Sequence, residues 1–94
     1  MSDRPTISVA SKAYSEFCRA RGLAEGTIRT RESALKLLLE VTGDIRVENV
    51  TPVHVERLFQ TYAWAPLTAN TRLSQYKSFF YWCRQRRFVP RDFD

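Results

Sequence analysis

Residues 68–87, TANTRLSQYKSFFYWCRQRR, form the stretch of sequence that decides the fold. The stretch begins with small polar residues, passes into a run of aromatic residues and ends in arginines, and it contains no acidic residue. Its apolar side chains recur at the spacing of an amphipathic helix. The spacing predicts a helix over residues 68–88, capped by Thr68, with Tyr81 and Trp82 projecting away from the core. The expected core face consists of Ala69, Leu73, Tyr76, Phe79, Phe80 and Cys83.

The same periodicity predicts three further helices earlier in the chain, over residues 7–21, 25–42 and 52–63. Thr6 is expected to cap the first of them, and Gly22 is expected to end it in a left-handed conformation. Thr51 and Pro52 predict a sharp start for the third, because a capping hydroxyl is followed by a proline whose missing N–H is not needed there.

The 94 residues fit one domain, and three glycines with four prolines are too few for the turns of a small all-β fold. We therefore predict an all-α, compact four-helix bundle over residues 1–94. Ile45, Val47 and Val50 of the connector are expected to complete its core from a loop. Arg31 falls on the apolar stripe of the second helix, where we expect its stem to pack on the core and its guanidinium to reach water.

The positive charge of the chain is concentrated at one end. Residues 1–56 carry eight cations and eight acids, whereas residues 57–94 carry seven cations and two acids, which accounts for the net charge of +5. So polarised a distribution favours a polyanionic partner over charge that only keeps the protein soluble.

The residues needed for independent catalysis are missing from the sequence. Cys18 and Cys83 lie 65 residues apart, no Cys/His cluster occurs, and His54 is the single histidine. We expect no cofactor, no metal and no small-molecule substrate. Without a signal peptide or an apolar run of about 18 residues, a cytoplasmic protein with free thiols and no membrane span is expected.

Two predicted helix starts favour contact with phosphates. EGTIRTR (residues 25–31) and LTANTR (residues 67–72) each place a threonine near a helix N-terminus and an arginine within the next five residues. Free N–H groups and the positive end of the helix dipole suit phosphates there. Capping of the helix is the alternative role for Thr27 and Thr68. Small polar residues on the fourth helix would let it lie close to a major groove.

Two segments together resemble the core-binding domain of tyrosine recombinases, the SAM-like N-terminal domain of phage integrases and Xer-type recombinases. TIRTRESALKLLL (residues 27–39) and TANTRLSQYKSFFYWC (residues 68–83) carry the likeness, the latter to the family pattern T-x-N-x-x-L-S-x-L-R-x-F-F-x-W-A. The resemblance spans residues 6–93. Arg31 stands where the family often has tyrosine, and the exit segment RRFVPRDF lacks the customary Asn-Pro. The matching residues are Thr27, Leu35, Thr68, Asn70, Arg72, Leu73, Ser74, Lys77, Phe79, Phe80 and Trp82.

The resemblance implies an orthogonal, SAM-like bundle that binds double-stranded DNA at a recombination core site. The second and fourth helices would face the DNA, and the first and third would pack behind them or meet neighbouring recombinase protomers. Catalytic residues belong to a second domain of the family, so this chain is expected to bind DNA without cutting it. A start at Met1 suggests a compact integrase or a Xer-like enzyme of a bacterial or phage-infected cytoplasm. The candidate DNA-binding residues are Thr27, Arg29, Arg31, Lys36, Thr68, Asn70, Thr71, Arg72, Ser74, Gln75, Lys77, Arg84, Arg86 and Arg87.

Two other functions compete with DNA binding. A helical protein-interaction module is indicated by Trp64, Tyr81 and Trp82, because aromatic residues off the core face are common at protein interfaces. A small phage-encoded regulator of the helix-turn-helix type is less favoured, since the connector of residues 43–51 exceeds the usual tight turn.

Overall fold

The computed structural model describes residues 4–90, which form four α-helices and one short 3₁₀ helix. The α-helices are α1 (Ile7–Ala20), α2 (Glu25–Thr42), α3 (Pro52–Tyr62) and α4 (Pro66–Gln85), and the 3₁₀ helix η1 (Val47–Asn49) precedes α3. In this described part of the chain the only extended pairing is an isolated antiparallel bridge between Thr6 and Arg46. The all-α bundle is confirmed, and the bounds of α2 are as predicted.

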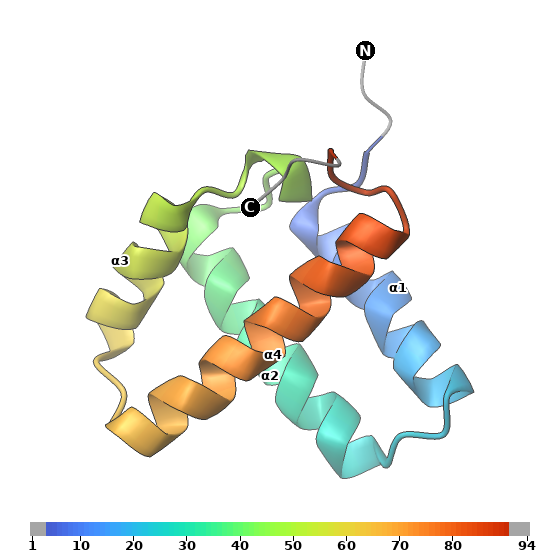
Figure 1. Ribbon diagram of the computed structural model, residues 1–94, viewed down its shortest axis with the longest axis horizontal. Coiled ribbons are helices and arrows are strands. Elements are labelled where there is room, and N and C mark those ends of the chain that lie inside the picture. The colour runs from blue at the N-terminus through green and yellow to red at the C-terminus, as the bar shows by residue number, and fades with distance from the viewer. Residues whose placement is uncertain (1–3, 91–94) are drawn as a thin grey trace.

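Helix α4 crosses the front of the molecule with α2 behind it, while α1 and α3 lie on either side (Figure 1). The core fills the space between these helices. It is continuous across all four, and Phe79 of α4 is fully buried at its centre. The hydroxyl of Tyr76 donates a hydrogen bond of 2.7 Å to the carbonyl of Ala34, which ties α4 directly to α2.

The start of α1 is stabilised from outside the helix. Thr6 occupies the N-cap position as predicted, but its side chain makes no capping hydrogen bond. Instead the carboxylate of Asp44, from the connector, accepts the Ser8 N–H at 2.9 Å and the Ser8 hydroxyl at 2.6 Å. These hydrogen bonds lower the pKa of Asp44. Gly22 follows the helix with a φ of +83°, the left-handed conformation that was predicted.

Helix α3 starts as predicted, and α4 does not. Pro52 is the first residue of α3, and the Nδ1 atom of His54 accepts the Thr51 N–H at 2.9 Å. Helix α4 begins at Pro66, two residues before the predicted start, because this proline takes the first helical position that suits its fixed φ. It ends at Gln85 rather than at residue 88, since Arg87 has a φ of +61° that no helix continues.

The burial of α4 differs from the prediction at two residues. Trp82 was expected outside the core, yet it is only 6% exposed and packs against the rings of Tyr14, Phe17 and Phe88. Leu73 was expected in the core, yet it is 38% exposed. Both errors have one cause. Tyr14 and Phe17 of α1 cover Trp82, whereas α4 runs away from α3 beyond the turn of residues 63–65 (Figure 1) and leaves Leu73 in the open hollow between these two helices.

The connector supplies core residues, as the sequence predicted. Val47 and Val50 are buried, and Ile45 packs against the core from its edge. Cys18 and Cys83 are both buried and both free thiols.

Candidate functional site

The outward face of α4 carries one continuous polar ridge. Asn70, Ser74, Lys77 and Tyr81 follow one another at spacings of three or four residues, and all four are exposed. Tyr81 is 63% exposed, as predicted. No other described helix lies in front of α4 (Figure 1). We call these four residues the α4 ridge.

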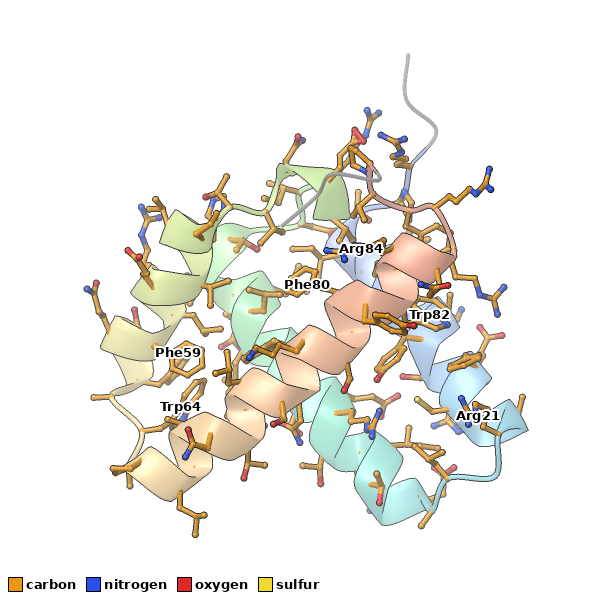
Figure 2. All side chains as sticks on the ribbon, in the orientation of Figure 1. Arg21, Phe59, Trp64, Phe80, Trp82 and Arg84 are labelled. Atoms are coloured by element: carbon orange, nitrogen blue, oxygen red, sulfur yellow. The ribbon has the colours of Figure 1, made fainter. Side chains whose placement is uncertain are left out.

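Arg72 and Gln75 lie on a flank of α4 rather than on the ridge. The Arg72 guanidinium stands 5.6 Å from the centre of the Trp64 ring, and its Nη1 atom lies 3.4 Å from Oε1 of Gln75. Trp64 in turn stacks on Tyr62 and meets the edge of Phe59, to which it lies close in Figure 2. Trp64 is therefore half-buried and partly covered by Arg72.

The two threonines near helix starts occupy equivalent positions. Thr27 is the third residue of α2 and Thr68 the third residue of α4, and the N-cap positions belong to Ala24 and Ala65. Capping, the alternative role for both threonines, is therefore wrong. Neither helix start receives a side-chain cap, which leaves first-turn N–H groups available to an anion. Thr71, one turn further on, donates its hydroxyl to the Leu67 carbonyl at 3.1 Å.

Arg29 and Lys36 are separated from the α4 ridge. Lys36 lines a hollow between α1 and α2 to which α4 contributes no residue, and two carboxylates, of Glu16 and Glu32, share it. Arg29 precedes Lys36 by seven residues and so lies on the same side of α2. Its charge helps to lower the pKa of the Glu25 carboxyl, although the main cause is the hydrogen bond from Arg19.

Arg31, Lys77 and Arg86, all candidates from the sequence, line one hollow of about 600 Å³ between α1 and α4. Arg31 does not simply reach water as expected: its Nη1 atom donates a 2.6 Å hydrogen bond to the Tyr14 hydroxyl. Burial nevertheless raises the pKa of Tyr14, although the charge of Arg31 opposes that shift. Arg21, at the end of α1, completes the cationic lining. Sequence reasoning missed Arg21, because nothing along the chain connects a helix end to a surface 60 residues away.

The remaining candidate cations gather near the end of α4. Arg84 and Arg87 line a further hollow together with Arg4 from the N-terminal segment. Arg84 also lies at the edge of a larger hollow, of about 660 Å³, between α3 and α4. Figure 2 shows Phe80 and Arg84 on the α3 side of α4, and the exposed Leu73 shares this hollow.

Residues 4–90 contain neither a candidate metal site nor a candidate membrane span. No group of three or more His, Cys, Asp or Glu side chains is placed to hold a metal ion there. None of the helices in this range has the length and apolar character needed to cross a membrane.

Comparison with known proteins gives no relative for this chain. No family model matches it, and neither a curated protein nor a solved structure is significantly similar to it.

Proposed function

We propose that this protein binds double-stranded DNA through the α4 ridge. The observation that carries the proposal is the exposed surface of α4, which has Lys77 on the ridge, Arg72 and Arg84 beside it, and no carboxylate among its twenty residues. A DNA duplex presents one negative charge per ~1.7 Å of its axis, so a surface of this charge attracts it at any sequence.

The shape of α4 suits a major groove. A groove about 12 Å wide admits a single α-helix, and α4 projects from the front of the bundle along its whole length (Figure 1). Ser74 and Ser78 are small enough to allow close approach. The Asn70 amide is exposed and has the donor and acceptor needed to pair with an adenine edge. Lys77 would contact a phosphate, as would the first turn of α4 at Thr68.

Within DNA binding, we propose the role of a core-binding domain of a tyrosine recombinase in a bacterial or phage-infected cytoplasm. The motifs of residues 27–39 and 68–83 support this role. In it, the chain would hold a recombination site while another domain carries out strand cleavage. A reading frame that runs past Asp94 into a domain with the catalytic arginines, histidine and tyrosine would support the role. A reading frame that continues into a domain without these catalytic residues would count against the role.

Fluorescence anisotropy with a labelled duplex, measured between about 50 and 200 mM salt, tests the DNA proposal. We expect log affinity to fall linearly with log salt, by about 0.9 per phosphate contacted. Lys77→Ala should reduce that slope by about 0.9. Asn70→Ala should leave the slope unchanged and lower the preference among duplex sequences.

Lys12→Ala is the matched control, because Lys12 is an exposed lysine of α1 in the hollow that α4 does not line. It removes the same charge and should leave the slope unchanged. If the wild-type protein binds no duplex at about 50 mM salt, the proposal fails.

A protein-interaction module is the second candidate, and the hollow between α3 and α4 favours it. That hollow exposes Leu73 and Tyr81 beside the half-buried Val55 and Phe80. Contact with a second copy of this chain would give self-association that is insensitive to salt. Sedimentation velocity should then show dimers that are lost in Leu73→Asp and retained in Lys77→Ala. A monomer at all concentrations would rule out contact with a second copy through this hollow.

A further inference from the structure

The hollow between α1 and α4 combines a cationic lining with aromatic rings. Four cations line it: Arg21 directly after α1, Arg31 from α2, Lys77 from within α4 and Arg86 directly after α4. Among residues 4–90, no aspartate or glutamate belongs to its lining. None of the four cations forms a salt bridge with another residue between 4 and 90. The packing of the helices brings these charges together, although most of the four residues lie far apart in the sequence.

Aromatic rings hold the guanidinium groups in place. The Arg86 guanidinium carbon lies 5.4 Å from the Trp82 ring centre and 5.7 Å from that of Phe17. The Arg21 guanidinium lies 5.6 Å from the centre of the same Phe17 ring. Such cation–π contacts favour the charged groups without neutralising them, and they leave the N–H edges free for a ligand. In Figure 2, Trp82 lies between α4 and α1, and Arg21 lies at the end of α1.

Four like charges around one hollow repel each other, so the arrangement lowers the stability of the protein unless an anion joins it. The ligand that matches is a phosphate, because a guanidinium fork donates two parallel hydrogen bonds to its oxygens. Arginines already held on rings lose little side-chain entropy on binding, which raises affinity. A carboxylate ligand would satisfy only part of this donor set.

We propose that this hollow binds phosphate groups of the nucleic-acid backbone, so that α1 as well as α4 contacts the DNA. This inference rests on the proposed function and extends it, since a core-binding domain is expected to keep its first helix away from the DNA. Continuity with the α4 ridge favours backbone phosphate over a free phosphate ion. Lys77 and Tyr81 belong to both surfaces, so a duplex seated on the ridge places one strand beside the hollow.

The test compares two double variants by anisotropy with the same duplex over the same range of salt. Arg21→Gln with Arg86→Gln should reduce the slope of log affinity against log salt by about 1.8, or about 0.9 for each lost phosphate contact. Lys12→Gln with Arg57→Gln is the matched control, because both residues are exposed and outside the hollow. The control should leave the slope unchanged. Circular dichroism melting curves confirm that each variant is folded.

The outcomes separate this inference from the proposed function. If the wild-type protein binds the duplex and the Arg21/Arg86 variant keeps the wild-type slope, the inference is overturned and DNA binding stands. If the wild-type protein binds no duplex, DNA binding itself fails. Titration with inorganic pyrophosphate, followed through the side-chain NMR signals of the arginines, identifies the source of the phosphate. Signals that shift with pyrophosphate and not with duplex overturn the backbone assignment, and shifts with duplex support it.

Discussion

Trp82 and Tyr81 are neighbours on α4, yet the structure predicts opposite consequences for their removal. Trp82 is 6% exposed and Tyr81 is 63% exposed. Trp82→Ala should therefore destabilise the domain strongly, whereas Tyr81→Ala should change its free energy of unfolding by no more than about 0.5 kcal/mol. The comparison tests the burial that the sequence alone failed to predict.

The expected loss for Trp82→Ala follows from what surrounds the indole. Removing a buried Trp or Phe side chain costs about 3–5 kcal/mol from lost transfer free energy and from the cavity left behind. Tyr14, Phe17 and Phe88 all lie with ring centres within 6 Å of it, at 5.2, 5.7 and 5.4 Å, and add pairwise stabilisation. The Nε1 atom, however, is buried without a hydrogen-bond partner among the described residues. Its removal recovers about 1–3 kcal/mol, so we expect the lower part of the range, about 3 kcal/mol.

Urea denaturation followed by far-UV circular dichroism measures this difference, because fluorescence would lose one of the two tryptophans. A domain of 94 residues has a total stability of about 5–14 kcal/mol, so the alanine variant retains a measurable transition in most of that range. If the alanine variant shows no transition, Trp82→Phe replaces it. The phenylalanine variant keeps a ring, removes the unpaired N–H and should lose well under half as much free energy of unfolding. Equal, small effects of Trp82→Ala and Tyr81→Ala would refute the burial of Trp82.

Two further predictions concern pH. Burial raises the pKa of the Cys83 thiol to about 12, and it raises the pKa of Tyr76 as well. The contribution of Cys83 is complete below the pKa of the unfolded thiol, about 8.5, and that of Tyr76 below the pKa of an unfolded tyrosine, about 10. Each contribution is lost as pH rises above that value, by up to about 1.4 kcal/mol per unit. Thermal melts from neutral to alkaline pH should show this loss, and Cys83→Ala should lessen it; an equal slope in the variant would contradict the assignment. The pKa of Asp44 is lowered by its bonds to Ser8, so its contribution is present above about pH 4 and lost on acidification. Asp44→Ala should lower the melting temperature at neutral pH, the gap to wild type should close as pH falls, and a constant gap would count against this role.

The helices of this protein are readable from local sequence. Three local features indicate where α1, α2 and α3 begin. They are Pro52 with its fixed φ, the glycine after α1, and the three- and four-residue spacing of apolar side chains. The start of α4 was mispredicted because Thr68 and Pro66 are both plausible starts, and the proline's fixed φ gives it priority.

The candidate site could be read from the sequence only in part. The exposed spacing of Asn70, Ser74, Lys77 and Tyr81 follows from helical geometry alone, so the α4 ridge was predictable. The separation of Arg29 and Lys36 from that ridge, and the approach of Arg21 to Arg86, depend on how whole helices are placed. No pattern within one helix records which of its flanks another helix will cover.

By itself, then, the sequence determined the all-α class, the starts of α1, α2 and α3, the core of the connector and the acid-free surface of α4. These depend on backbone preferences and on periodicity, which act over a few residues. Only the tertiary structure decided that Asp44 stabilises the start of α1, that Trp82 is buried while Leu73 is exposed, and that four cations meet between α1 and α4. Each of these depends on residues far apart in the chain, because each is set by how α1 packs against α2 and α4 while α3 stays largely clear of α4.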